Sequence, residues 1–329
     1  MKKVRDLKRK SRTQYSGKEK NQIVLDGLGA EERDWGKTMN RSNLQPFRQL
    51  ALYGVLVLVI FWILFPLWWA IVLSIKHPAD FFTAKFLPFV QFSPTLDHWR
   101  YEWNAFDDPA GMGRSLLGSL LVASASTAAA LALGTPAAFG LRLRRRWGRR
   151  VVWLLGFFLL PRIIPPVIVA LPFSHLMRLL HLGDTYPALV IAHTTLSLPL
   201  AILLPYSAMA DVPPDLLDAA RVDGCTLFDA LRLIMVPLLA PVLSATAILC
   251  FALSWNEFLF ALMNVQQRVQ TVTLAVASLL NKDGVEWSYV GSHLVMVTLP
   301  PVVFVLLARR YIVRGLTFGA IPSEPARSD

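Results

Sequence analysis

Apolar residues gather in six long segments of the chain, separated by polar stretches. The segments cover residues 50–75, 115–141, 151–173, 187–210, 239–263 and 289–308. Each is close to the ~20 apolar residues that a helix needs to cross a bilayer. The pattern therefore predicts an all-α membrane protein with six transmembrane helices.

The polar stretch 211–241, between the fourth and fifth segments, has the pattern of two short helices. Pro213 and Pro214 suit a first helical turn, and Gly224 suits a sharp break. Thr226, with Asp229 three residues on, has the spacing of a capping box. Apolar side chains then recur at helical spacing on one face: Leu227, Leu231 and Ile234, with Phe228 and Met235 beside them. Such an amphipathic pair is suited to docking in a groove of another protein.

The basic residues predict the orientation of the spans. With the N-terminus inside, the inner segments 1–48, 142–150, 211–238 and 309–329 hold 25 Lys and Arg, against 7 in the outer loops. Cytoplasmic loops carry an excess of Lys and Arg. We therefore expect both termini and the 211–238 loop in the cytoplasm. The net charge of +11 then reflects topology and not nucleic-acid binding.

Three regions follow from this pattern. Residues 1–48 hold 13 Lys and Arg against 6 Asp and Glu, with almost no apolar periodicity, which predicts a largely disordered cytoplasmic tail. Residues 49–312 form the six-helix domain with its 211–238 loop, and 313–329 form a C-terminal cytoplasmic tail. The two cysteines, Cys225 and Cys250, imply no disulfide framework.

The sequence contains no pattern typical of an enzyme. It has no G-x-x-x-x-G-K-[ST] phosphate loop, so we do not expect this chain to hydrolyse ATP. The six histidines show no metal-ligand spacing, which predicts no metal site. No serine–histidine–aspartate or paired-carboxylate arrangement stands out. A membrane enzyme is therefore disfavoured.

Two charged residues, Arg162 and Glu257, lie inside the predicted spans. An intramembrane charge costs ~2.5–3.5 kcal/mol or more, so it usually faces a cavity or a partner. Two interpretations stay open: the residues line a translocation path, or they make structural or intersubunit contacts. Trp255 and Asn256 precede Glu257, and indole and amide groups suit carbohydrate rings and hydroxyls.

The loop also carries a family pattern. Asp218-Ala219-Ala220-x-x-Asp223-Gly224, followed by Ile234-x-x-Pro237, resembles the "EAA" loop of bacterial ABC importer permeases. In that family the loop is a coupling helix that docks into the cytoplasmic ATPase. The resemblance implies the type I ABC importer permease fold and an ATPase contact made by Asp218, Ala219, Ala220, Asp223, Gly224, Leu227, Phe228 and Leu231. Asp218 replaces the usual glutamate, which keeps the charge but shortens the reach.

Other stretches resemble the carbohydrate-uptake branch, in particular the inner type of maltose-transporter permease. They are Pro66-Leu67-Trp68, Leu182-Gly183-Asp184-Thr185-Tyr186, Ser254-Trp255-Asn256-Glu257-Phe258 and Gly315-Leu316-Thr317. The resemblance implies a bacterial inner-membrane heterodimer that works with a second permease subunit, two ATPase subunits and an extracytoplasmic solute-binding protein. This chain would bind no cofactor, because ATP and magnesium would sit on the ATPase subunits.

Alternatives stay open within transport. The loop pattern also fits ABC permeases for a polyamine, an amino acid or a phosphonate. A self-sufficient secondary transporter would predict ion-coupling carboxylates at mid-membrane, and only Glu257 lies inside a predicted span, towards its end.

Overall fold

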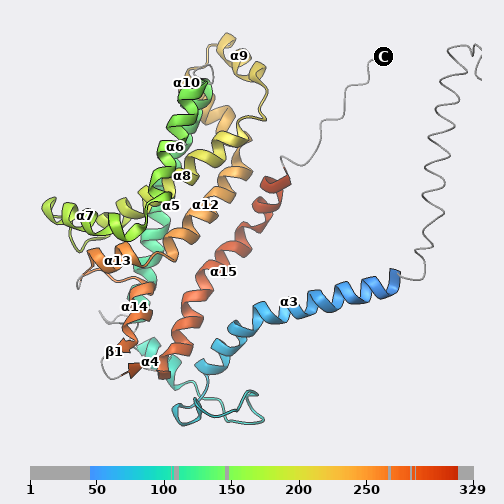
Figure 1. Ribbon diagram of the computed structural model, residues 1–329, viewed down its shortest axis with the longest axis vertical. Coiled ribbons are helices and arrows are strands. Elements are labelled where there is room, and N and C mark those ends of the chain that lie inside the picture. The colour runs from blue at the N-terminus through green and yellow to red at the C-terminus, as the bar shows by residue number, and fades with distance from the viewer. Residues whose placement is uncertain are drawn as a thin grey trace, which may run out of the picture. The chain divides into compact units, whose positions relative to one another are not determined.

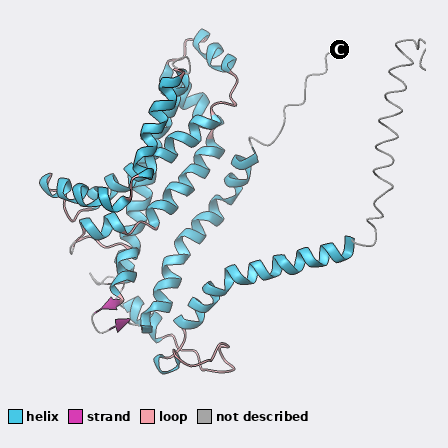
Figure 2. Ribbon diagram, in the orientation of Figure 1, coloured by secondary structure: helices cyan, strands magenta, loops and turns pink. Residues whose placement is uncertain are grey.

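The computed structural model describes residues 45–104, 106, 111–144, 148–265, 268–281, 284–285 and 287–317. Helices dominate this part of the chain (Figures 1 and 2). The elements are α3 (Gln45–Ser74), η1 (Pro78–Asp80), α4 (Asp97–Asn104), α5 (Met112–Leu143), α6 (Arg149–Ile163), α7 (Pro166–Leu179), α8 (Tyr186–Ala208), α9 (Pro214–Val222), α10 (Leu227–Asp229), the π-helical η3 (Ala230–Met235), α11 (Val236–Leu238), α12 (Ala240–Trp255), α13 (Leu259–Asn264), α14 (Val272–Ser278), β1 (Leu280–Asn281), β2 (Gly284–Val285) and α15 (Trp287–Thr317).

The chain divides into two units, Met1–Pro66 and Leu67–Asp329. The described part of the first unit is the apolar beginning of α3, and the second unit holds the remaining elements. The tails predicted at 1–48 and 313–329 lie largely outside the described residues. Within the second predicted tail, α15 continues to Thr317, five residues beyond the expected boundary at 312.

Four of the six apolar segments form continuous helices long enough to cross a membrane. These spans are Gln49–Ser74, Met112–Leu143, Tyr186–Ala208 and Tyr289–Leu306. A fifth is counted if α10–α11 and α12 are taken as one span, although they are bent by 80°. The helical membrane fold is thus confirmed, with four or five such spans in the described part of the chain.

The apolar segment 151–173 is interrupted, because α6 ends at Ile163 and α7 begins at Pro166. Ile164 is extended, with φ −71° and ψ 130°, as expected for a residue that precedes a proline. Pro165 and Pro166 also supply no N–H groups to continue the hydrogen-bond ladder. The segment is therefore two helices joined by a break.

The apolar segment 239–263 is interrupted as well. The α12 helix ends at Trp255 and α13 begins at Leu259. The Asn256 side chain donates to the Ala252 carbonyl (2.8 Å), and the Glu257 carboxylate accepts from the amides of Phe260 (3.0 Å) and Ala261 (3.3 Å). These side chains satisfy backbone groups at the break, so the helix can stop inside an apolar segment.

The core lies where α5 packs against α8 and α12. Small residues allow the close approach of α5 and α8: a Cβ atom on Gly134 would lie 2.6 Å from the Ala201 carbonyl oxygen. One buried cluster joins this core to the stretch after α8, through Phe139, Ile202, Leu231 and Met235. The polar loop is therefore anchored in the helix bundle.

The end of the second unit opposite α9 carries α4 and the β1–β2 hairpin (Figure 1). There the His293 Nε2 atom of α15 lies 2.6 Å from the Glu102 Oε1 atom of α4, and both side chains are largely buried. A buried hydrogen bond of this kind fixes the short helix α4 on α15.

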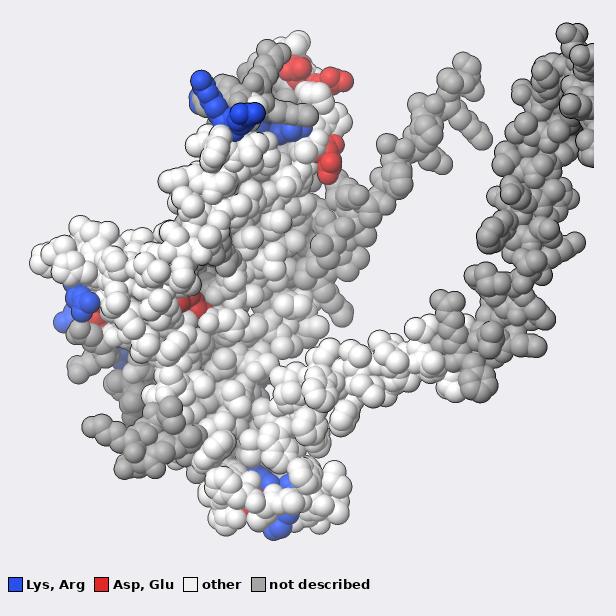
Figure 3. Space-filling view, in the orientation of Figure 1, with Lys and Arg blue, Asp and Glu red and all other residues white. Residues whose placement is uncertain are grey.

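Most charged side chains lie at the ends of the helix bundle. Figure 3 shows Lys, Arg, Asp and Glu gathered around α9 and the adjoining end of α5, and around the loop that follows α3 at the other end. Between these two ends, the face shown is mostly uncharged, apart from a small charged group beside α7 and one acidic patch in the middle of the bundle. This distribution is that of a bundle embedded in a bilayer.

Candidate functional site

The α9 helix ends in a turn that only a flexible residue accommodates. Gly224 adopts φ +82°, a left-handed conformation that favours glycine. Its N–H donates to the Arg221 carbonyl (3.1 Å), and the Cys225 N–H donates to the Ala220 carbonyl (3.0 Å). These two bonds form a Schellman cap, which satisfies carbonyls left free at the end of α9. The predicted glycine break is confirmed.

The next helix begins with the predicted capping box. The Asp229 N–H donates to Thr226 Oγ1 (3.2 Å), and the Thr226 N–H donates to Asp229 Oδ2 (3.1 Å). Each side chain thus satisfies a backbone donor of the other residue. The two caps together give the stretch from α9 to α10 a defined shape.

The apolar side chains of this stretch face in opposite directions. Leu227 and Phe228 are 56% and 67% exposed, whereas Leu231 is 9% exposed and packs in the core cluster with Met235. The prediction that Leu231 contacts a partner is therefore corrected, because its side chain is used inside this chain. Leu227 and Phe228 form the outward apolar face.

The family pattern on α9 is mostly exposed. Asp218 pairs with Arg221 (3.0 Å), and Ala219 and Asp223 are exposed, whereas Ala220 is buried. A groove of about 590 Å³ lies beside Asp218, between α9 and the end of α5. On its α5 side, Arg142 donates to the carbonyls of Met209 (3.1 Å) and Ala210 (3.2 Å), which holds the α8–α9 connection in place.

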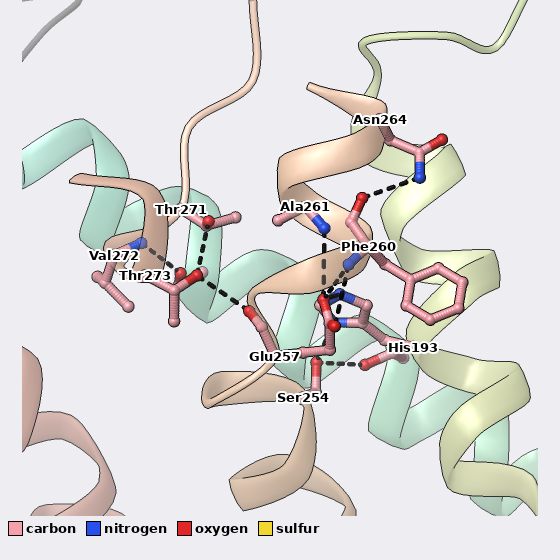
Figure 4. A network of polar contacts seen from close by, with 11 residues as sticks. His193, Ser254, Glu257, Phe260, Ala261, Asn264, Thr271, Val272 and Thr273 are labelled. Carbon is pink, nitrogen blue, oxygen red and sulfur yellow. Dashed lines mark hydrogen bonds and ion pairs between the residues drawn. The ribbon is translucent and has the colours of Figure 1, made fainter. Parts of the chain in front are cut away.

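A second polar group lies within the bundle, around Glu257 (Figure 4). The Glu257 Oε2 atom is 3.3 Å from His193 Nε2, and His193 Nδ1 is 2.7 Å from Ser254 Oγ. Ser254 in turn accepts a hydrogen bond from Ser126 Oγ (3.0 Å). The group therefore connects α5, α8 and α12 with the break before α13.

This polar group borders a cavity of about 750 Å³. Glu257 and Asn256 line the cavity, together with His193, Ser197 and the Pro165–Pro166 break. Trp255, which was predicted to line a translocation path, does not line this cavity. It is 2% exposed, stacks on Phe251 and donates from Nε1 to the Val297 carbonyl (3.2 Å).

Arg162 belongs to the last turn of α6, close to the break at Ile164. Its side chain lies outside the described residues, so its predicted role stays a prediction.

Sequence reasoning missed His193 and Ser197 as members of this site. It considered the histidines only for metal-ligand spacing. The available signal was the polar cluster His-Thr-Thr-Leu-Ser at 193–197 inside an otherwise apolar segment. Polar residues within a span usually face the bundle interior or a cavity.

The geometry defines a class: a multi-pass helical membrane protein with a capped amphipathic loop and a polar cavity between broken helices. Comparison with known proteins identifies the class further. Residues 130–318 match the family described as "Binding-protein-dependent transport system inner membrane component". The chain belongs to this family. It is thus a transport component of the inner membrane and not an enzyme.

Individual relatives agree with this assignment. The chain is 34% identical over 259 residues to the probable ABC transporter permease protein y4oR of Sinorhizobium fredii, covering 78% of this chain and 90% of the relative. It is 31% identical over 280 residues to the trehalose transport system permease protein SugB of Mycobacterium tuberculosis, covering 83% and 98%.

A solved structure shares the fold. It is a chain of a bacterial ABC transporter involved in the import of the acidic polysaccharide alginate. The match has a TM-score of 0.66 at 18% identity and covers 83% of this chain and 98% of that chain. The ABC importer permease fold is therefore confirmed.

Proposed function

We propose that this chain is one of two permease subunits of an ATP-driven ABC importer that takes up a sugar or oligosaccharide. An extracytoplasmic binding protein delivers the solute, and two ATPase subunits supply the energy. ATP and magnesium bind to the ATPases, and this chain carries no cofactor or metal. The family assignment and the exposed apolar face of the capped loop support the proposal, and the name of the trehalose relative favours a sugar.

The proposed topology has six membrane crossings with both termini in the cytoplasm. The pairs α6–α7 and α12–α13 then act as broken spans. The excess of 25 Lys and Arg over 7 supports this orientation, because it places the 211–238 loop on the basic side. The charged end around α9 and the adjoining end of α5 is then the cytoplasmic end (Figure 3).

The loop would couple ATP hydrolysis to transport as a rigid lever. Leu227 and Phe228 insert into a groove of an ATPase subunit, as amphipathic helices generally do. Leu231 and Met235 lie on the opposite side and pack in the helix core. Closure of the ATPases therefore moves the ends of α5, α8 and α12, and the spans rock between inward-open and outward-open states.

A substitution on the exposed face tests the coupling role. We expect Phe228→Ala to leave membrane insertion unchanged, because this side chain is 67% exposed. The variant should copurify with much less ATPase subunit, since a buried aromatic anchor at an interface contributes about 2 kcal/mol or more. Uptake should fall with it. The matched control is Phe82→Ala, an 83% exposed phenylalanine in the loop after α3, which should retain the ATPase.

Normal ATPase binding and uptake in Phe228→Ala would contradict the coupling role.

The solute class is tested separately, with the complete complex and its binding protein in proteoliposomes. Accumulation of radiolabelled trehalose or maltose supports a sugar. Accumulation of spermidine, an amino acid or a phosphonate, without either sugar, would reject the sugar proposal and keep the importer proposal.

A further inference from the structure

The cavity of about 750 Å³ lies where two helix breaks meet. One wall is the Pro165–Pro166 break between α6 and α7, and another is the Asn256–Phe258 break between α12 and α13. The α8 helix closes the space between them. Non-helical backbone at membrane depth is tolerated where it is buried in protein or lines a cavity. In transporters, discontinuous helices commonly frame the substrate site.

One buried polar atom at this cavity has no hydrogen-bond partner among the described residues. Ser197 and His193 are 1% and 2% exposed, and both line the cavity. His193 Nε2 pairs with the Glu257 carboxylate at 3.3 Å, whereas Ser197 Oγ forms no hydrogen bond with any described residue. A buried polar atom without a partner is costly, so Ser197 Oγ indicates a ligand or water that completes its bonds.

The composition of the walls selects the chemistry of that ligand. Leu196, Leu253 and Pro166 supply apolar surface, while Ser197, His193 and Glu257 supply hydrogen-bonding groups. Sugar rings combine apolar C–H faces with hydroxyls that both donate and accept. A carboxylate that accepts, beside an imidazole and a hydroxyl, fits neighbouring hydroxyls and repels a phosphonate. The volume lies within the range of small-molecule sites, about 300–1,000 Å³.

The polar groups are also held in position before any ligand binds. The Glu257 carboxylate is fixed by the Phe260 and Ala261 amides, and His193 is fixed by Ser254 through Nδ1 (Figure 4). Fixed groups lose little conformational entropy when they bind.

We infer that this cavity is a sugar-binding subsite carried by this chain, in which Ser197 Oγ and the Glu257 carboxylate bind sugar hydroxyls while His193 holds the carboxylate in place. The inference rests on the proposed function. It assigns to this subunit direct contact with the solute as it crosses the membrane.

Ser197→Ala is the sharpest test, because Ser197 Oγ bonds to no described residue and its removal costs the fold no internal hydrogen bond. The complete complex is purified without its binding protein, and binding of radiolabelled trehalose and maltose is measured by scintillation proximity. We expect Ser197→Ala to weaken sugar binding about 3- to 10-fold, the effect of one hydrogen bond. Uptake in proteoliposomes with the binding protein should slow as well.

The control is the Ser244→Ala variant of the same complex. Ser244 lies on α12, donates to the Ala240 carbonyl (2.7 Å) and does not line this cavity. Its sugar binding should equal that of the unmodified complex. Ala252→Leu, which fills the cavity from α12, serves as a second variant and should reduce sugar binding more strongly than Ser197→Ala.

Three other results would overturn the inference. Unchanged sugar binding in both cavity variants, with normal uptake by the unmodified complex, rejects the subsite and leaves the proposed function intact. Loss of the second permease subunit from the Ser197→Ala complex would show that this face is a subunit interface. Failure of the unmodified complex to import either sugar, while it imports another solute, rejects the sugar function and the subsite together.

Discussion

At the scale of residues, the left-handed backbone of Gly224 is what allows α9 to end and α10 to begin within four residues. The Schellman cap on one side and the Thr226–Asp229 capping box on the other use only local hydrogen bonds. Such caps follow from short sequence patterns, so they were predictable. The burial of Leu231 was not predictable, because it depends on contacts with Phe139 and Ile202, which are distant in sequence.

Two substitutions at Gly224 distinguish the effect of backbone strain from the effect of a side chain at the surface proposed to contact the ATPase. No atom lies within 4 Å of a Cβ built on this residue, so a side chain meets no steric obstacle. We expect Gly224→Val to cost about 1–2 kcal/mol of loop stability, since a β-branched residue resists positive φ. Gly224→Asn should cost less, because asparagine tolerates this conformation. ATPase stimulation by the assembled complex should therefore fall in the first variant and largely persist in the second.

Equal loss of ATPase stimulation in both Gly224 variants would show that contact, and not backbone conformation, limits coupling. Unchanged stimulation in Gly224→Val would mean that the turn carries no coupling role.

At the scale of elements, hydropathy located the apolar segments but not the breaks inside them. Pro136 and Pro199 lie within the continuous helices α5 and α8, whereas Pro165 marks a break. The presence of a proline does not by itself decide whether a helix breaks, because neighbouring helices can compensate for the missing hydrogen bond. The break at Asn256 depends likewise on the Glu257 carboxylate meeting the amides of α13. A hydropathy sum does not include such side-chain to backbone hydrogen bonds, so it does not predict these breaks.

The packing of α5 on α8 gives a prediction at this scale. A Cβ atom on Gly134 would lie 2.6 Å from the Ala201 carbonyl oxygen, so Gly134→Ala forces the two helices apart. We expect a loss of about 1–3 kcal/mol, typical of overpacking, measured by thermal unfolding of the purified complex. Gly140→Ala on the same helix is the control, because no atom lies within 4 Å of its Cβ position. Equal melting temperatures for the two variants would contradict the close contact.

At the scale of the whole molecule, the candidate sites differ in how far the sequence could reveal them. The loop proposed for coupling is one continuous stretch with a family pattern, so its position was predictable. The cavity combines Ser197 of α8 with Glu257 beyond α12, sixty residues later. Folding brings these side chains together, and no spacing in the sequence encodes the pairing. Glu257 was identified as an intramembrane charge, but its neighbours His193 and Ser197 required the structure.

The two native cysteines allow the proposed orientation to be tested without altering the loop. Cys225 is partly exposed beside Gly224, whereas Cys250 is fully buried in α12. A membrane-impermeant maleimide should label Cys225 in inverted vesicles and not in right-side-out vesicles, because the loop is proposed to be cytoplasmic. Trp103→Cys, at an 80% exposed position of α4, should label from the opposite side. Bound ATPase subunit should slow the labelling of Cys225 by covering the loop. Labelling of Cys225 from the outside would invert the topology and remove the loop from the side where ATP is hydrolysed.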